Sequence, residues 1–251
     1  MESPALTRAE AELYEEWKRA GPHLAEYASE CLGTAFLVFC VVGVVATLFG
    51  TSSPVTSHIP DPALRLLIAG LLLGGAGWLV ALSPPGRLSG GHINPAVSLG
   101  FWLLDKMHRR DLAGYVLGQL LGSGIGAWLG VWAFGLLARE VHDATLRPKV
   151  GPAAAFLLEM GATFLLTSVI YSFVSHKRLM RWTPGAAMLM SGVLVGLDGN
   201  LSGAGMNPAR WFGPALAASH FRDSAVYVVG PLLGGGLAGL IYGRFLIHES
   251  K

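Results

Sequence analysis

Apolar and polar residues follow one another along the chain in long blocks. Six apolar runs have the length of a membrane-spanning helix, since about 20 predominantly apolar residues cross the hydrocarbon core of a bilayer. They cover approximately residues 30–50, 63–83, 111–137, 152–175, 183–201 and 223–247. The third run is the clearest, because no charged residue occurs from Leu112 to Ala138. The pattern predicts an all-α membrane protein with six transmembrane helices.

Two shorter apolar stretches lie between these runs. Asn94–Leu104 follows the second run, and Asn207–Ala218 follows the fifth. At 1.5 Å per residue, a helix of this length measures about 16–18 Å, which is roughly half the thickness of a bilayer core. Neither stretch can cross the membrane alone. We therefore expect two re-entrant half-helices.

The two halves of the chain repeat the same order of segments. Glu30 opens the first half with the pattern E-x-x-G-T-A-F, and Glu159 opens the second with E-x-x-A-T-F. Three spanning helices per repeat is an odd number, so the second copy must be inverted. Inverted repeats with interrupted helices at matching positions indicate a transport path near the bilayer midplane. We expect a channel domain over 30–247, formed by repeat 1 (about 30–137) and repeat 2 (about 152–247).

The chain ends are predicted to lie in the cytoplasm. Residues 1–29 are polar and acidic, unlike a cleaved signal peptide, and predict a cytoplasmic segment with an amphipathic lead-in helix from Thr7 or Arg8. Residues 248–251 form a short C-terminal tail. With the N-terminus inside, 12 of the 18 Lys and Arg residues fall on the cytoplasmic side. Positive charge favours that side, so both termini are expected there.

Composition excludes several other classes of protein. Charged residues make up 14% of the chain and hydrophobic residues 52%, whereas about a quarter of a soluble chain is charged. The net charge of +2 and the scattered basic residues argue against nucleic-acid binding. Cys31 and Cys40 are about 13 Å apart on one predicted helix, too far for a disulfide. We find no nucleophile–base set or metal-ligand cluster, and expect no enzyme activity, cofactor or metal.

Each predicted half-helix opens with the same three residues. These are Asn94, Pro95 and Ala96 in the first half, and Asn207, Pro208 and Ala209 in the second. One copy is consistent with an ordinary helix start, with Asn at the N-cap and Pro at the first helical position. Two copies at equivalent places of an inverted repeat resemble the aquaporin, or major intrinsic protein, family over about residues 28–247. The resemblance implies the aquaporin fold and a homotetramer in the lipid bilayer.

The physical chemistry of the two motifs agrees with a pore. Half-helices whose N-termini meet at mid-membrane place two partial positive charges there, which repel cations and hydronium. The amides of Asn94 and Asn207 can cap these helices and also offer N–H donors to the lumen. A water molecule that accepts from both amides must reorient, which opposes proton relay. Such a site selects by geometry and electric field.

Four further residues match family positions. The resemblance places Arg210 in the outer constriction, where it donates to solutes and excludes cations; the alternative is a snorkelling arginine. Glu30 and Glu159 match acids that accept hydrogen bonds from backbone amides of the re-entrant loops. Interfacial carboxylates at helix starts are the alternative, which suits Glu30 better. His92 matches a family histidine, and either loop packing or a backbone hydrogen bond would explain it.

Family spacing assigns the outer constriction to Gly74, Val195, Ala204 and Arg210. Strict water channels typically have a large aromatic residue and a histidine where this chain has Gly74 and Val195. The four residues predict a wide, weakly polar opening that resembles the metalloid-permeable branch of the family. We expect a passive channel for water and small uncharged solutes (glycerol, urea or undissociated metalloid acids) that excludes ions and protons. We also expect it in the plasma (inner) membrane.

Two alternatives remain at this level. A side chain such as Trp211, Phe36 or Phe39 would narrow the mouth and give a strictly water-selective channel. A structural membrane protein with a non-conducting pore is the second alternative, although both Asn-Pro-Ala motifs and Arg210 are intact. Glycines occur at every fourth position of the third and sixth predicted helices, Gly114–Gly130 and Gly235–Gly243, and predict close helix packing. The family resemblance places both stripes where the repeats face each other.

Overall fold

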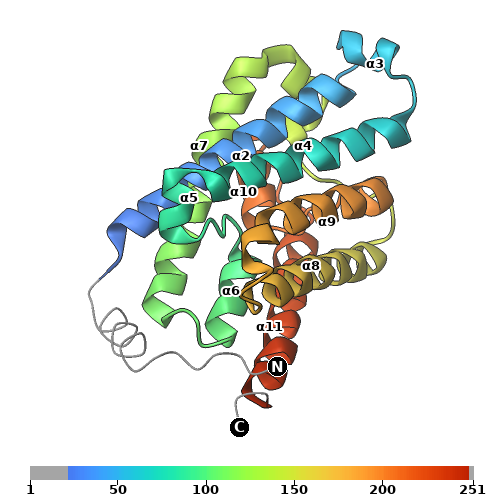
Figure 1. The fold of residues 1–251 in the computed structure, drawn as a ribbon. Coiled ribbons are helices and arrows are strands. Elements are labelled where there is room, and N and C mark those ends of the chain that lie inside the picture. The colour runs from blue at the N-terminus through green and yellow to red at the C-terminus, as the bar shows by residue number, and fades with distance from the viewer. Residues whose placement is uncertain (1–21, 249–251) are drawn as a thin grey trace.

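The computed structural model describes residues 22–248, with side chains as far as Arg244. The predicted lead-in helix from Thr7 or Arg8 and residues 249–251 lie outside the described part. Every regular element within 22–248 is helical, as the apolar pattern predicts. Figure 1 shows the helices as one bundle, in which the short helices α6 and α10 lie among longer ones.

The long helices follow the predicted runs closely. They are α2 (Leu24–Phe49), α4 (Pro62–Leu82), α7 (Arg109–Glu140), α8 (Pro152–Val174), α9 (Thr183–Asp198) and α11 (Gly230–His248). One clear difference is at α2, which begins six residues before Glu30. Polar residues at this helix start lie at the side of α7, where Tyr27 Oη donates to Asp111 at 2.6 Å. Such a contact extends the helix beyond its apolar part.

Helix α9 is shorter than predicted. It has 16 residues, about 24 Å at 1.5 Å per residue, and is preceded by a 3-10 turn at Met180–Trp182. Five helical stretches between residues 22 and 248 are long and apolar enough to cross a membrane, and α9 falls below that length. The last of the five, Ala225–Arg244, includes a π-helical turn, η3 (Ala225–Val229), before α11.

Both predicted half-helices are present. Helix α6 covers Pro95–Leu103 and α10 covers Pro208–Ala217, so each begins at the proline of its Asn-Pro-Ala motif. Short connecting elements complete the chain: α3 (Pro54–His58), α5 (Pro84–Ser89) and η1 (His142–Ala144). The proline pair at the start of α5 therefore forms a separate turn of helix between α4 and α6.

Close helix contacts use the glycine stripes, but in a different way from that predicted. Helix α2 lies against α7, α4 against α9, and α8 against α11. A Cβ on Gly122 or Gly126 of α7 would overlap the backbone of α2 at Cys31 or Ala35. The first stripe thus packs within repeat 1. A Cβ on Gly235 of α11 would meet the backbone of Ala96 in α6, so the second stripe is the one that joins the two repeats.

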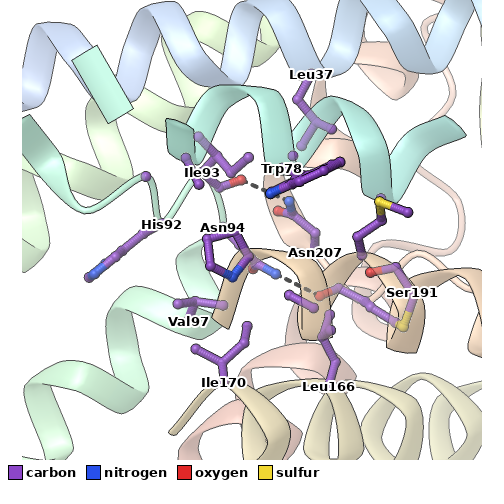
Figure 2. A pocket seen from close by; sticks show the side chains of 18 of the residues that line it. Leu37, Trp78, His92, Ile93, Asn94, Val97, Leu166, Ile170, Ser191 and Asn207 are labelled. Carbon is purple, nitrogen blue, oxygen red and sulfur yellow. Dashed lines mark hydrogen bonds between the residues drawn. The ribbon is translucent and has the colours of Figure 1, made fainter. Parts of the chain in front are cut away.

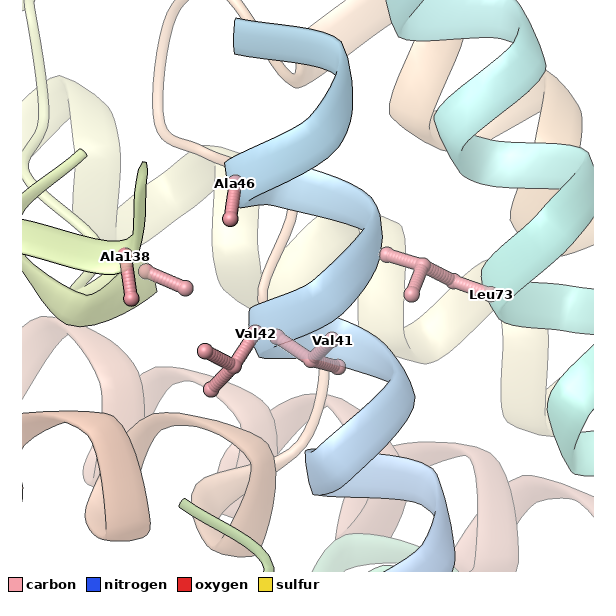
Figure 3. Close-up of a cluster of buried hydrophobic side chains, with 6 residues drawn as sticks. Val41, Val42, Ala46, Leu73 and Ala138 are labelled. Atoms are coloured by element: carbon pink, nitrogen blue, oxygen red, sulfur yellow. The ribbon is translucent and has the colours of Figure 1, made fainter. Parts of the chain in front are cut away.

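The exterior is apolar and the interior holds polar groups. Trp132, Leu136 and Leu197 are 84%, 76% and 73% exposed, as expected for side chains that face lipid. Figure 3 shows a buried apolar cluster in which Val41 and Val42 of α2 lie between Leu73 and Ala138. By contrast, Glu30 and Glu159 have no exposed surface. These buried carboxylates need hydrogen-bond donors, which the re-entrant loops supply.

Candidate functional site

Each asparagine of the two motifs caps its half-helix. Asn94 Oδ1 accepts from the backbone N–H of Ala96 at 2.9 Å, and Asn207 Oδ1 accepts from that of Ala209 at the same distance. Both asparagines have extended backbone, which is the geometry of an N-cap. Local sequence therefore aims the N-terminus of each half-helix, with its partial positive charge, at the middle of the protein.

The two loops are joined by reciprocal hydrogen bonds (Figure 2). Asn94 Nδ2 donates to the carbonyl oxygen of Met206 at 2.9 Å, and Asn207 Nδ2 donates to that of Ile93 at 2.8 Å. Ile93 and Met206 have φ values of 43° and 52°, a region that non-glycine residues rarely occupy. Such backbone costs about 1–3 kcal/mol per residue and persists only where its surroundings enforce it. Here it belongs to the residues whose carbonyls accept from the opposite loop.

Glu30 holds the first loop. Its Oε1 accepts from the backbone N–H of His92 at 2.9 Å and from Ser89 Oγ at 2.7 Å. Its Oε2 accepts from the backbone N–H of Ile93 at 2.7 Å and from Gln119 Nε2 at 2.7 Å. All four contacts bring a hydrogen to the carboxylate, so the buried charge is fully hydrogen-bonded.

Glu159 holds the second loop in the same way. It accepts from the backbone N–H groups of Gly205 and Met206, both at 2.7 Å, and lies 2.7 Å from Ser202 Oγ. A tyrosine stabilises the far side of each loop: Tyr115 Oη donates to the carbonyl of Ser89, and Tyr227 Oη to that of Ser202. The inverted repeat is therefore visible at the level of single hydrogen bonds.

Ser202 also contacts a second carboxyl group, Asp198, which sequence reasoning missed. Ser202 Oγ lies 2.6 Å from Asp198 Oδ2 and 2.7 Å from Glu159 Oε1. A hydroxyl has a single hydrogen, so it can donate to only one of these oxygens. For both contacts to be hydrogen bonds, one of the two carboxyl groups must supply a hydrogen of its own.

Other buried polar residues complete the loop supports. Gln119 bridges Glu30 and Ser98, and Ser123 Oγ lies between the carbonyl of Ala209 and the N–H of Gly213. Both have no exposed surface, although they lie in a long apolar helix. An isolated polar residue within a predicted span is the only sequence signal that marks them.

His92 combines the two roles left open by the sequence. Its backbone N–H donates to Glu30, while its ring lies 3.1 Å (Nδ1) from Ser98 Oγ. The ring also stacks on Phe101 with centroids 4.5 Å apart. The side chain therefore packs the first loop against α6.

A cavity of about 200 Å³ runs past both asparagines. All four residues assigned to the outer constriction are among those that line it: Gly74, Val195, Ala204 and Arg210. A Cβ on Gly74 would lie 2.6 Å from the carbonyl oxygen of Met188, so α4 touches the α9 backbone here. Gly74 therefore borders the cavity with its main chain, and a larger side chain would meet α9 first.

Arg210 is half-buried at the cavity. Its Nη1 is inaccessible to solvent and has no acceptor among the described residues. The guanidinium interacts electrostatically with the carboxylate of Glu159. An unpaired buried donor of this kind is costly. The residue itself is only half-buried and lines the cavity, so its guanidinium lies beside whatever occupies the cavity.

The three side chains that the sequence offered as candidates for narrowing the mouth lie elsewhere. Trp211 is 2% exposed and its ring stacks on Tyr227, away from the cavity lining. Phe36 is 44% exposed, and Phe39 packs against Phe134. None of the three lines the cavity, so the suggested narrowing by these residues is wrong for the described structure. Cys31 and Cys40 are likewise absent from the lining.

With the geometry established, comparison with known proteins decides the family. The chain matches the family model "Major intrinsic protein" over residues 16–242. The protein belongs to the major intrinsic protein family. Its membership shows that the chain is an integral membrane channel protein and that it is not an enzyme, as the sequence predicted. Within residues 22–248, no group of three or more His, Cys, Asp or Glu side chains is arranged to hold a metal ion.

Relatives and a solved structure support the same conclusion. Aquaporin TIP2-1 of Arabidopsis thaliana is 34% identical over 231 residues, which cover 91% of this chain and 90% of that protein. Aquaporin AqpM of Methanothermobacter thermautotrophicus is 33% identical over 244 residues, covering 88% and 96%. The aquaglyceroporin of Plasmodium falciparum has a TM-score of 0.67 at 22% identity, over 89% of this chain and 95% of that one. The predicted aquaporin fold is confirmed.

Proposed function

We propose that this family member is a passive channel for water and small uncharged solutes such as glycerol, urea or undissociated metalloid acids, and that it excludes ions and protons. The observation that carries the proposal is the convergence of three donor groups on one apolar cavity: the amides of Asn94 and Asn207 and the guanidinium of Arg210. Each asparagine amide uses one hydrogen in the bond to the opposite loop and keeps a second one. Donors with hydrogens to spare suit a permeant that brings lone pairs and no charge.

The electrostatics of the cavity support the exclusion of cations. Two half-helix N-termini and a guanidinium add positive potential within a low-dielectric wall, where it acts strongly. The small residues Gly74, Val195 and Ala204 support passage of solutes larger than water at the outer end. We assign the protein to the plasma (inner) membrane as a homotetramer, with both termini in the cytoplasm.

A strictly water-selective channel is the second candidate. One observation favours it: the large ring of Trp78 lines the cavity although three of the four outer residues, Gly74, Val195 and Ala204, are small. Osmotic swelling of proteoliposomes with water, urea, glycerol and boric acid separates the candidates. Flux of at least one solute above that of protein-free liposomes supports the proposal. Water flux without any solute flux favours the second candidate, and no flux at all overturns both.

A further inference from the structure

The cavity wall contributed by α4 contains one large ring. This helix supplies Leu73, Gly74, Gly77, Trp78 and Ala81 to the lining. Leu73 is 8% exposed and belongs to the buried apolar cluster between α2 and its neighbours, whereas Trp78 retains 41% exposure. Figure 2 draws the Trp78 side chain among those that line the cavity, which is the observation that places the indole there.

Small residues flank Trp78 along α4. A Cβ on Gly75 would meet nothing within 4 Å, and a Cβ on Gly77 would lie 3.8 Å from Ile93 Cδ1. Helix α9, which packs against α4, contributes Ala187, Met188 and Ser191 to the lining. Trp78 is thus the largest side chain that α4 contributes to the lining.

The ring is placed at the level of the two asparagines. Gly77, its neighbour on α4, faces Ile93, which directly precedes Asn94. Figure 2 draws the side chains of Trp78 and of Leu37 in α2 among those that line the cavity together with Asn94 and Asn207. Trp78 lies about one helical turn beyond Gly74, so a solute that has passed the outer residues meets the indole next.

We propose that Trp78 is the residue that sets the upper size limit of the channel, at the midplane rather than at the outer mouth. The inference rests on the proposed function. The outer opening admits solutes of glycerol size, and the indole then restricts them by cross-section while water passes the asparagine amides in single file. Pore diameter and lining donors decide selectivity in such channels. The discriminated class is small neutral polyols and amides.

The test compares Trp78→Ala and Trp78→Phe with wild type in proteoliposomes, using stopped-flow measurements of water, urea, glycerol and erythritol permeability. We expect Trp78→Ala to raise the ratio of glycerol to water permeability about tenfold, equivalent to about 1.4 kcal/mol of barrier. Trp78→Phe, with a smaller ring, should give an intermediate ratio. The matched control is Trp132→Ala on α7, which removes an indole that is 84% exposed and borders no part of the cavity; its ratio should equal that of wild type.

The outcomes separate this inference from the proposed function. Retained water flux shows that a variant is folded, and Trp78→Phe serves if the alanine variant loses water flux. If wild type passes solutes and both Trp78 variants keep its ratio, the inference is overturned while the function stands. If wild type passes water alone and Trp78→Ala admits glycerol, the inference holds and the water-selective candidate replaces the proposed function. If wild type passes neither water nor solute, the proposed function and the inference fall together.

Discussion

The two re-entrant loops perform the same task with different supports. In both, a buried glutamate accepts from two consecutive backbone N–H groups, and a tyrosine donates to the serine carbonyl at the loop start. In the first loop, the amide of Gln119 completes the hydrogen bonds of Glu30. In the second, Ser202 joins Glu159 to another carboxyl group, Asp198, near the charge of Arg210.

The difference shows which parts of the site are fixed and which can vary. A half-helix that begins at mid-membrane is preceded by a loop whose buried backbone N–H groups need an acceptor. In both repeats a glutamate carboxylate is that acceptor. The other hydrogen bonds that this glutamate accepts can come from different side chains. The first loop has a neutral neighbour and an all-donor shell. The second loop has the carboxyl group of Asp198 and the charge of Arg210 nearby. The two ends of the pore therefore differ in charge, and the charged end is that of Arg210.

The largest effect is expected from removal of either glutamate. Glu30→Ala or Glu159→Ala leaves two buried backbone donors without an acceptor, at a cost of about 1–3 kcal/mol each. We expect loss of the folded channel, measured as thermal unfolding in detergent and as yield of monodisperse protein. Arg139→Ala, at an exposed position in the last turn of α7, is the control and should change stability by no more than about 0.5 kcal/mol. Wild-type stability of both loop variants would refute the proposed support.

A smaller effect, confined to one repeat, is expected from Gln119→Leu. The change removes the donor to Glu30 Oε2 and the contact with Ser98, and should cost about 1–3 kcal/mol in the same unfolding measurement. Leu117→Ala, at a 62% exposed position of the same helix, is the matched control. If Gln119→Leu is no more destabilising than the control, the two loops do not differ in the way described.

Substitutions of Asp198 test whether one of the two carboxyl groups at Ser202 donates a hydrogen to the serine. An asparagine amide supplies the hydrogen that the serine contact requires, so Asp198→Asn should change stability by less than about 1 kcal/mol. Asp198→Ala should cost more stability, because it removes the hydrogen-bond partner that Asp198 provides for the Ser202 hydroxyl. By contrast, Glu30→Gln places an N–H group against a shell of donors and should destabilise more than Asp198→Asn. Equal effects of the two amide substitutions would contradict this donation.

The smallest effect on stability is expected from Ala204→Cys. The residue is 1% exposed and lines the cavity beside Arg210, and one sulfur atom adds little volume. The variant should keep its water flux and become sensitive to mercurials, whereas wild type, whose two cysteines lie outside the lining, should be insensitive. Thiol-reversible inhibition of wild type would show that Cys31 or Cys40 reaches the lumen.

Long-range patterns in the sequence predicted more than isolated residues did. The apolar runs located α4, α7 and α8 to within a few residues, because a membrane span needs a long apolar sequence and little else. The repeated Asn-Pro-Ala motif located α6 and α10, since an N-cap and an N1 proline define a helix start. The start of α2 was missed because polar contacts to α7 extend that helix before its apolar part.

The residues missed in the site have a common physical reason. Gln119 acts through contacts with Glu30 and Ser98, which are distant in sequence. Asp198 contacts Ser202 nearby, but its role depends on the contact of Ser202 with Glu159, 43 residues before it. Trp78 matters only because α4 turns it to the cavity, and no local periodicity marks such an arrangement. The expected narrowing by Trp211 failed for a related reason. Adjacent residues on a helix point in directions about 100° apart, so Trp211 points away from the side of the half-helix that carries Arg210. Its ring stacks on Tyr227 instead. Helix geometry, and not proximity in sequence, decided which ring reaches the cavity.

The central claim is that the loops form a pore that passes water and rejects charge, with Arg210 as the charged donor of the second loop. Its most direct test is the water permeability and the proton flux of the same proteoliposomes, for wild type and Arg210→Val. We predict high water flux in both, no proton flux in wild type, and measurable proton or cation leak in Arg210→Val, since the half-helix dipoles remain but the guanidinium is lost. Wild-type proteoliposomes without water flux, or an Arg210→Val variant as tight to protons and cations as wild type, would contradict the account.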